Sequence, residues 1–531
     1  MTLMKSLLAA SALIALTAGA AQAKTLVYCS EASPSHFDPG PQTGGNDFDS
    51  SSQTMYNRLV QFTPGSTAVE PALAESWDIS EDGKEYTFHL RPGVKFHTQP
   101  YFTPTRDLNA DDVIFSFERQ YKEDNPYFAY LPNLSWDYYQ GMDMPRYVTS
   151  IEKVDDRTVK FILSEPNAPM LANLAMDFAS IVSKEYADQL QAAGTPELFS
   201  TQPVGTGPFQ FVDYQLDSAI RYAAFPDYWG GKQPIDDLIF AITTDATVRA
   251  QRLLAGECDI MPYPAPADIA TLQANENLTV IEQEGLNIGY MSYNVTEAPF
   301  DNVDVRKALS MAVDKQAIID AVYEGQGQVA KNLIPPTMWS YDDAIPADTY
   351  DPEAAKALLE EAGVSGLTVD LWAPPVSRPY MPNGQRVAEM IQADWAAIGV
   401  TANIVTYEWT EYRERGKEPD RSGPFLIGWT GDNGDPDNFF ATLFSCSAIG
   451  VSNYSSWCND DFEAAIQSAK TVSDEAERTA LYTTAQEIFK AEEPALNIAH
   501  SKVFMPMNKR VQNFVLSPLG THSFVGVDVA E

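Results

Sequence analysis

The stretch that decides the fold is FLIGWTGDNGDPDNFF, residues 425–440, in which an apolar strand runs into Gly431, Asp432 and two further acids. It completes a unit that begins with the strand LTVDLWAP (367–374) and includes the alternating strand VTANIVTYEW (400–409). Between these strands, one helical face carries Val387, Met390, Ile391, Trp395 and Ile398. Open α/β sheets bind ligands at the carboxyl ends of their strands. Arg378 and Asp432 both follow such ends, so we expect a binding site there.

The rest of the chain also alternates between strands and helices, without a repeat or a low-complexity linker. Residues 87–97 predict a strand, a turn and a second strand, and residues 109–112 start a helix. The spacing of Val305, Leu309, Val313 and Ile319 predicts a helix over 304–323. Asp351-Pro352 marks the start of another helix, which Gly363 ends. This order predicts an α/β fold.

Composition narrows the class of protein. The chain has 531 residues, which corresponds to roughly two to four domain-sized units. The formal net charge is −38, so nucleic acid and anionic membrane surfaces are poor partners. Hydrophobic residues make up 44% of the chain and the mean hydropathy is −0.24, values typical of a soluble globular protein.

The N-terminal segment has the features of a secretory signal peptide. Lys5 supplies a positive charge, residues 7–18 are apolar, and Ala21-Gln22-Ala23 is a small-residue cleavage site. We expect residues 1–23 to be removed after Ala23 and the protein to be exported. No later segment has about 18 uninterrupted apolar residues, so the mature protein is expected to be soluble.

Four cysteines remain in the chain: Cys29, Cys258, Cys446 and Cys458. An even number in an exported protein favours disulfides, but four cysteines allow three pairings, and free buried thiols are the alternative. Joining Cys446 to Cys458 would close a short loop. Joining Cys29 to Cys258 would close a very long one.

Most catalytic and metal-binding motifs are absent from the sequence. The acid cluster fails the EF-hand pattern because Gly434 and Pro436 stand where ligands are needed. None of the five histidines forms an H-E-x-x-H motif, and there is no G-x-S-x-G elbow, Walker loop or G-x-G-x-x-G. Carboxylates are so abundant that a glycosidase pair cannot be identified. We therefore predict no catalytic residue, no metal and no cofactor.

One interpretation of the remaining charges is a receptor for a zwitterion. Asp432, beside Trp429 and two glycines, would be costly to bury unless a cation paired with it. Arg378, close to Pro375 and Pro379, has the planar fork that suits a carboxylate. The alternative is that both are ordinary loop charges or members of internal salt bridges.

Longer motifs resemble the extracellular solute-binding proteins of family 5, which include the dipeptide receptors of bacterial ABC importers. The resemblance extends over essentially the whole chain after residue 23. It is carried by KTLVYCSEASPSHFDP, LAESWDISEDGKEYTFHLRPGVKFH, LNADDVIFSFERQ, LAMDFASIVSKEYAD, GTGPFQ, MPYPAPADIA, KNLIPPTMW and GWTGDNGDPDNFFATLFSC. One departure is the spacing in RERGKEPDRSGPF (413–425). The resemblance therefore does not extend to that loop, but it still includes Arg378 and Asp432 on either side.

The resemblance implies a two-lobed periplasmic binding protein fold of the large peptide-binding class (type II) with a two-segment hinge. Lobe I would comprise residues 24–285 and 503–531, with an inserted subdomain, and lobe II residues 286–502. The crossings would be GLNIGYMSYN (285–294) and LNIAHSKVF (496–504). It also implies the disulfides Cys29–Cys258 and Cys446–Cys458.

The family pattern further assigns the site. Asp432 in Trp429–Asp432 would hold a peptide ammonium, and Arg378, in Arg378-Pro379-Tyr380 before Pro382-Asn383, would hold its carboxylate. Gly431 lies within the first motif, while Trp429, Tyr380 and Tyr407 would line side-chain space or serve as core aromatics. Asp435 and Asp437 are expected to hold the loop by accepting backbone N–H groups.

The implied function is that of a periplasmic, monomeric, non-enzymatic receptor. It would close around a dipeptide and deliver it to an inner-membrane ABC permease complex. Alternatives are another small ligand (a longer peptide, a nickel chelate, glutathione, haem or a sugar), a secreted peptidase or glycosidase, and a second role in signalling.

Overall fold

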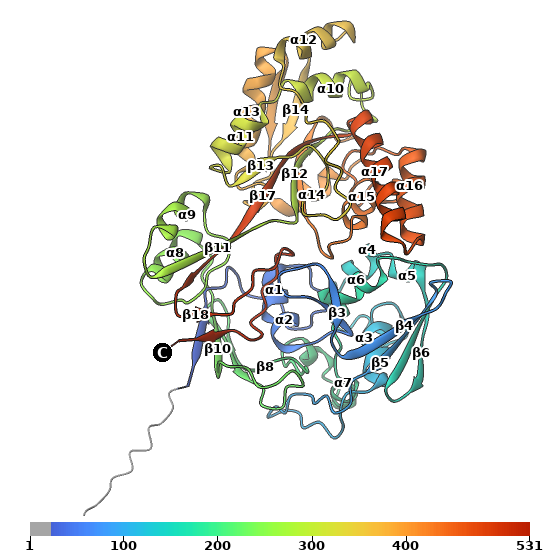
Figure 1. The fold of residues 1–531 in the computed structure, drawn as a ribbon, viewed down its shortest axis with the longest axis vertical. Coiled ribbons are helices and arrows are strands. Elements are labelled where there is room, and N and C mark those ends of the chain that lie inside the picture. Colours follow the sequence, from blue (N-terminus) through green and yellow to red (C-terminus); the bar gives the residue numbers. More distant parts are fainter. Residues whose placement is uncertain (1–22, 531) are drawn as a thin grey trace, which may run out of the picture.

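The computed structural model describes residues 23–530, and in it the chain forms two bodies placed end to end (Figure 1). The buried apolar side chains divide in the same way. One cluster draws on residues 26–260 and 505–529, and two others draw on residues 286–499. We call the first body lobe I and the second lobe II. The predicted signal segment lies outside the described residues, except for Ala23.

Lobe I is built around two four-stranded sheets, with strand orders β1-β10-β9-β8 and β4-β5-β7-β6. The second sheet and the helices around it form the lower right of Figure 1. The elements of this lobe are β1 (Thr25–Tyr28), α1 (Gly45–Ser50), α2 (Ser52–Met55), β2 (Val60–Phe62), β3 (Val69–Pro71), β4 (Ala74–Ile79), β5 (Glu85–Leu90), α3 (Ala110–Glu118), α4 (Asp137–Gly141), α5 (Met144–Tyr147), β6 (Val148–Asp155), β7 (Thr158–Leu163), α6 (Met170–Ala175), α7 (Lys184–Ala193), β8 (Phe209–Gln215), β9 (Ala219–Ala224), β10 (Asp237–Ala241), α8 (Ala246–Leu254), α9 (Pro266–Gln273), β11 (Leu278–Glu284), β18 (Val511–Gln512) and β19 (Asp528–Val529), with short 3-10 turns at Asp177–Ala179 and Pro196–Ser200.

Lobe II surrounds a sheet with the strand order β11-β17-β12-β16-β14-β15, in which β13 also pairs with β17. Strand β14 runs parallel to β15 and β16, whereas β12 runs antiparallel to β16 and β17. The elements are β12 (Asn287–Ser292), α10 (Val303–Met311), α11 (Lys315–Val322), β13 (Gly327–Val329), α12 (Pro352–Glu361), β14 (Thr368–Trp372), α13 (Gly384–Ala397), β15 (Thr401–Val405), α14 (Trp409–Gly416), β16 (Phe425–Thr430), α15 (Asp437–Phe444), α16 (Asp460–Thr471), α17 (Glu475–Glu492) and β17 (Ala495–Asn508), with a 3-10 turn at Cys446–Ala448.

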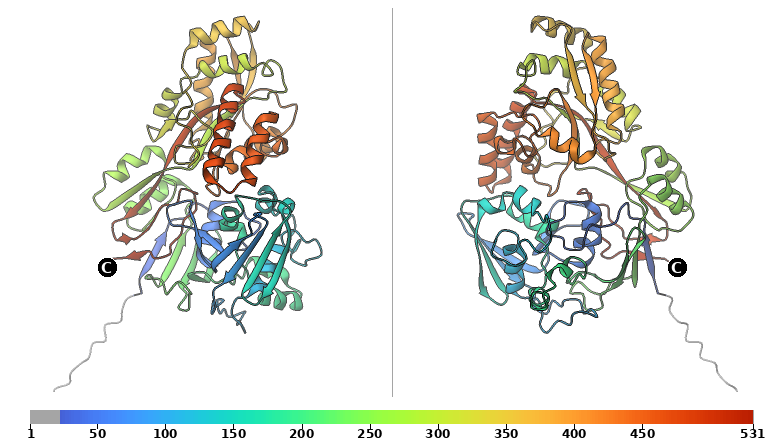
Figure 2. Two further views of the ribbon diagram at one scale, coloured as in Figure 1. Left: turned by 45° about the vertical axis from the view of Figure 1, so that its right-hand side comes forward. Right: turned by 180° about the vertical axis from the view of Figure 1, so that it is seen from behind.

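The two lobes are joined by two neighbouring segments. Strand β17 is 14 residues long and pairs with β12 near its start and with β11 from Lys502 onward. The other crossing is the short link between β11 and β12 at residues 285–286. Both crossings fall inside the predicted segments 285–294 and 496–504. Figures 1 and 2 show β17 running from the upper body toward the lower one in each view.

The unit that the sequence analysis started from is confirmed. The predicted strands and helix form β14, α13, β15 and β16. The two expected helix starts are also present: Asp351 accepts from the N–H of Ala354, and Asn109 forms a capping box with Asp112. These signals act over one helical turn, so they do not depend on tertiary structure.

Two local predictions are wrong. Residues 304–323 form two helices, α10 and α11, because Asp314 accepts from the N–H of Ala317 and thereby starts a second helix. The second strand predicted within 87–97 does not form. Instead, Val94 and His97 bond to Leu108 and Gly205 outside any ladder.

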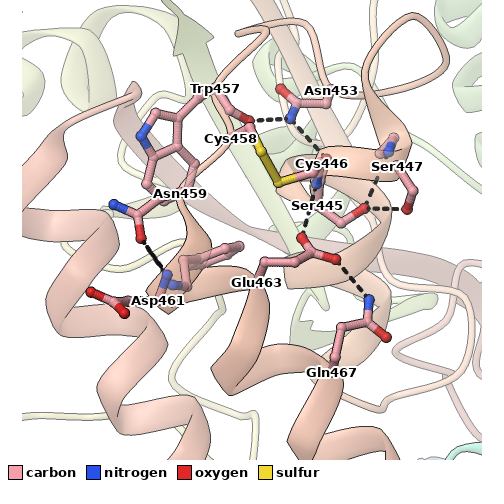
Figure 3. The surroundings of a disulfide bond; sticks show 12 residues. Ser445, Cys446, Ser447, Asn453, Trp457, Cys458, Asn459, Asp461, Glu463 and Gln467 are labelled. Atoms are coloured by element: carbon pink, nitrogen blue, oxygen red, sulfur yellow. Dashed lines mark hydrogen bonds between the residues drawn. A yellow bond between two sulfur atoms is a disulfide. The ribbon is translucent and has the colours of Figure 1, made fainter.

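Both implied disulfides are present. Cys29 is joined to Cys258, with Cα atoms 5.8 Å apart, and Cys446 to Cys458, with Cα atoms 4.8 Å apart. Figure 3 shows that the second bridge sits above Glu463, which accepts the N–H of Cys446 at 2.9 Å. The bridge thus fixes the segment between α15 and the start of α16.

No helix within residues 23–530 has both the length and the apolar character needed to cross a membrane.

Candidate functional site

Asp432 lies two residues beyond β16, at the boundary between the lobes, and is only partly accessible. Its Oδ1 accepts from the hydroxyl of Tyr138 at 2.9 Å, and Tyr138 belongs to α4 of lobe I. Its Oδ2 accepts from the side-chain amide of Asn438 at 3.0 Å. Among the described residues, no Lys, Arg or His pairs with this carboxylate. Burial raises its pKa to about 6, although both hydrogen bonds oppose the shift.

Asn438, in the first turn of α15, organises the residues around this carboxylate. Its Oδ1 accepts from the backbone N–H of Asp432 and from the indole N–H of Trp429, each at 2.9 Å. Its Nδ2 donates to Asp432, as described above. One amide side chain, 1% exposed, therefore fixes both the backbone and the carboxylate of Asp432 and also orients Trp429.

The two acids that follow have structural partners. Asp435 forms a bidentate pair with Arg478, at 2.9 and 2.8 Å, and accepts the N–H of Asp437. The expectation of backbone bonding is thus met for Asp435. For Asp437 it is wrong, because the carboxylate faces Lys470 at 3.4 Å and no backbone N–H of the described residues donates to it. Burial raises the pKa of Asp437, and Lys470 partly offsets that effect.

Gly431 is buried and holds the loop close to the first crossing. Its N–H donates to the carbonyl of Leu286 at 2.7 Å. A Cβ here would lie 2.7 Å from side-chain atoms of both Leu286 and Phe439. A larger residue here would require the side chains of Leu286 and Phe439 to shift, and glycine avoids that rearrangement.

Arg378 lies in a tight turn beyond β14 and is exposed. The turn is closed by two backbone bonds between Arg378 and Met381, at 3.2 and 3.0 Å. The guanidinium stacks over the ring of Trp409 at 5.1 Å, and no carboxylate of residues 23–530 pairs with it. It also contributes a positive charge near Tyr263 of lobe I. One guanidinium nitrogen donates to the carbonyl of Ser377 at 3.4 Å. Arg378 thus has an oriented side chain but no carboxylate partner among the described residues.

Tyr380 packs beneath this turn. Its ring lies against Gly428 of β16, and its carbonyl accepts from the hydroxyl of Tyr323 at 2.7 Å. Burial raises the pKa of the Tyr380 phenol to about 12. Tyr407 lies among core aromatics, with its ring 5.1 Å from Trp372 and the guanidinium of Arg415 4.5 Å above it. The structure therefore places Tyr380 beside Arg378, and it places Tyr407 against Trp372 and Arg415.

Asp432 and Arg378 both follow strands of the lobe II sheet, next to the lobe crossings. Strands β14 and β16 are parallel, so their carboxyl ends point the same way. Thr430, the last residue of β16, pairs with Asn287 at the start of β12. On the other side of Asn287, Ser501 donates to the carbonyl of Pro379 at 2.8 Å. The crossings thus lie between the two charged residues.

The loop after β16 contacts lobe I at several points. Besides the bond between Tyr138 and Asp432, Asn433 donates to Asn173 of α6 at 2.7 Å. Thr67 lies directly against Gly434. In Figures 1 and 2, the helices α4 to α6 lie below α15 to α17 in agreement with these contacts. The lobes are therefore in contact on the Asp432 side.

Four residues of this region were not predicted from the sequence: Tyr138, Asn173, Asn433 and Asn438. Asn438 lies within the quoted stretch, and an Asn in the first turn after a strand-end acid is a usable signal. Tyr138 lies 294 positions from Asp432, so only the fold connects them.

Two α/β lobes, two adjacent crossings and unpaired charges at the lobe boundary define the architecture of a solute-binding protein. Comparison with known proteins agrees. The model of the bacterial extracellular solute-binding proteins, family 5 (middle), matches residues 68–450. The chain is 56% identical to a dipeptide-binding protein of Escherichia coli K12, with 97% of each chain covered.

Two further relatives are informative. Heme-binding protein A of Haemophilus influenzae is 50% identical, covering 95% of this chain and 92% of that one. A crystal structure of a dipeptide-binding protein from Pseudoalteromonas sp. SM9913 in complex with Met-Leu superposes with a TM-score of 0.85 at 38% identity, covering 96% of this chain and all of that one. This chain belongs to the bacterial extracellular solute-binding proteins of family 5.

Proposed function

We propose that this protein is a periplasmic receptor that binds dipeptides between its lobes and delivers them to the permease of an ABC importer. The observation that carries the proposal is a pair of complementary, unpaired charges. Asp432 is a desolvated carboxylate without a cation, and Arg378 is an oriented guanidinium without an anion, among the described residues. A zwitterion with its charges far apart would satisfy both.

In this proposal the ligand ammonium binds Asp432 and the ligand carboxylate binds Arg378. Trp429 and Tyr380, which lie next to the two charges, would limit side-chain space, and Tyr407 is a further candidate for lining it. The binding mode requires no catalysis and no cofactor. The E. coli and Pseudoalteromonas relatives, both named as dipeptide-binding proteins, support the choice of ligand.

The proposal includes a mode of closure. Lobe I would comprise residues 24–285 and 503–531, with the β4-β5-β7-β6 sheet as its inserted subdomain, and lobe II residues 286–502. Rotation about the two crossings would enclose the ligand, and the closed monomer would dock on the permease complex. Export would remove residues 1–23, so N-terminal sequencing of the exported protein should give Lys24 first.

Capped ligands test the two charge assignments separately. We expect isothermal titration calorimetry to detect tight binding of Ala-Phe, and much weaker binding of both N-acetyl-Ala-Phe and Ala-Phe amide. Truncating one partner of a buried charge pair costs about 2–5 kcal/mol, so each cap should cost a comparable amount. Equal affinity for the free and capped ligands would refute the proposal.

Substitutions complete the test. Asp432→Ala should weaken Ala-Phe binding by about 2–5 kcal/mol and leave the weak binding of N-acetyl-Ala-Phe almost unchanged. Arg378→Gln should show the same pattern with the amide. Mass spectrometry of the titrated peptide should recover it intact, and turnover would favour a peptidase instead.

The haem-binding relative supports a second candidate, a haem receptor. Haem propionates would suit Arg378 but not the Asp432 carboxylate. An absorbance titration with haem separates the candidates, because haem binding should be insensitive to Asp432→Ala. Haem that binds tightly and displaces Ala-Phe would make haem the better ligand.

A further inference from the structure

The two crossings between the lobes are bonded to each other at Asn287 and Ser501. The N–H of Ser501 donates to Asn287 Oδ1 at 2.9 Å. Its carbonyl accepts from the N–H of Gly285 at 3.0 Å and from Asn287 Nδ2 at 3.2 Å. Asn287 is 1% exposed and Ser501 3% exposed. The backbone of Ser501 is thus fully held by the other crossing.

The Ser501 hydroxyl reaches out of this junction to the turn that carries Arg378. It donates to the carbonyl of Pro379 at 2.8 Å, closer than its alternative acceptor, Asn287 Oδ1, at 3.2 Å. Pro379 is the residue directly after Arg378. This side-chain bond connects the Arg378 turn to β17, the strand that passes between the lobes.

A second bond holds the same turn without touching the crossings. Tyr323, at the end of α11, donates to the carbonyl of Tyr380 at 2.7 Å. Gly289 of β12 lies under that carbonyl, where a Cβ would be 2.3 Å from the oxygen. The turn is thus tied to the body of lobe II by Tyr323 and to the lobe crossing by Ser501. Tyr323→Phe, which removes only the bond to the body of lobe II, is therefore a matched control for Ser501→Ala.

We propose that Ser501 is a positioning residue that couples capture of the ligand carboxylate by Arg378 to rotation about the lobe crossings. The inference rests on the proposed function, because it takes Arg378 as the carboxylate anchor. A carboxylate bound to Arg378 fixes the turn, and the turn then restrains the crossing through the bond between Ser501 and Pro379. Closure therefore responds to the C-terminal group of the ligand, and not only to its ammonium.

The coupling predicts a change in ligand preference that a general loss of stability would not produce. We expect Ser501→Ala to weaken Ala-Phe binding about three- to tenfold, as the loss of one buried hydrogen bond implies. Binding of Ala-Phe amide should stay within about twofold, because that ligand does not engage the coupling. Ser501→Thr keeps the hydroxyl and should retain the wild-type ratio. Equal weakening of both ligands by Ser501→Ala, or of neither, would overturn the proposal.

Small-angle scattering supplies the second readout and uses Tyr323→Phe as the control. At saturating Ala-Phe, the radius of gyration of Ser501→Ala should decrease less than that of the wild type. Tyr323→Phe should contract as the wild type does, because its bond involves neither crossing. Equal contraction of Ser501→Ala and the wild type, or an equal defect in both variants, would contradict the coupling.

The wild-type measurements separate this inference from the proposed function. If the wild type binds Ala-Phe and its amide equally, Arg378 is not the carboxylate anchor, and both proposals fail. If the wild type prefers the free carboxylate and Ser501→Ala keeps that preference, only the coupling fails.

Discussion

The hydroxyl of Tyr138 donates to Oδ1 of Asp432 across the boundary between the lobes, at 2.9 Å. The other carboxylate oxygen bonds to Asn438 within lobe II. A phenol and an amide orient the carboxylate but do not neutralise it, and burial raises its pKa to about 6. The site thus holds a charge that a ligand cation would stabilise, in contact with both lobes.

Tyr138→Phe should weaken dipeptide binding by about 1.5–3 kcal/mol, since hydrogen bonds to charged groups contribute that much. The loss arises because the closed form would no longer gain this bond between the lobes. Calorimetry with Ala-Phe measures it. Tyr139→Phe is the matched control, because the Tyr139 hydroxyl is buried without a partner among the described residues. A Tyr138→Phe variant that binds as tightly as Tyr139→Phe would exclude a role for the bond.

Dipeptide affinity should depend on pH through Asp432. Its pKa of about 6 means that the carboxyl is neutral in more acidic solution and cannot pair with an ammonium. Affinity should therefore decrease as the pH falls below 6, by up to about tenfold per pH unit, and level off above pH 7. Calorimetry between pH 4.5 and 8 would reveal this profile. The Asp432→Asn variant should lack it, and a profile that persists there would assign it to another group.

The same shift predicts that Asp432→Asn stabilises the empty protein at neutral pH. Burial penalises the ionised form of this carboxyl in the folded protein. The folded state is therefore more stable while the carboxyl is protonated, and that stability is lost as the pH rises through about 6. Because Asp432 keeps some solvent contact, we expect the substitution to raise the free energy of unfolding by about 1–3 kcal/mol at pH 7.5.

Chemical denaturation at two pH values tests this expectation. The difference between Asp432→Asn and wild type should vanish near pH 4, where the wild-type carboxyl is protonated in the folded state. A variant that is less stable than wild type at pH 7.5 would contradict it.

The sequence predicted the elements whose signals are local. Strands β14, β15 and β16 and helix α13 follow from hydrophobic periodicity alone. The single helix expected over 304–323 was wrong for a related reason. The hydrophobic periodicity continues from α10 into α11, although the helix is interrupted between them. The Asp314 side chain caps the start of α11 inside this periodic stretch. An Asp that could cap a helix can be recognised in the sequence. Only the backbone geometry shows whether that cap or the hydrophobic periodicity decides where the helix ends.

The positions of the two charged residues were also predicted from local signals, since Asp432 and Arg378 both follow strand ends. Their binding roles came from the family pattern and stay predictions. The partners of these residues were not predictable, because Tyr138, Arg478 and Ser501 reach the site through tertiary contacts. For Asp437, a turn residue was expected to bond backbone N–H groups, yet Lys470 comes close only through the packing of α16.

The loop that presents Asp432 should depend on the buried pair of Asp435 and Arg478. Both groups are at least nine-tenths buried, and their bidentate bonds satisfy charges that would otherwise be unpaired. Removing one partner of such a pair costs about 3–5 kcal/mol, so Arg478→Met should lower the free energy of unfolding by that amount. Arg386→Met removes an exposed pair with Glu389 and should cost less than about 1 kcal/mol. In the double variant Asp435→Asn/Arg478→Met, part of the stability should return, because no charge is left buried alone. A double variant less stable than Arg478→Met would show that Asp435 supports the loop mainly through the backbone N–H of Asp437.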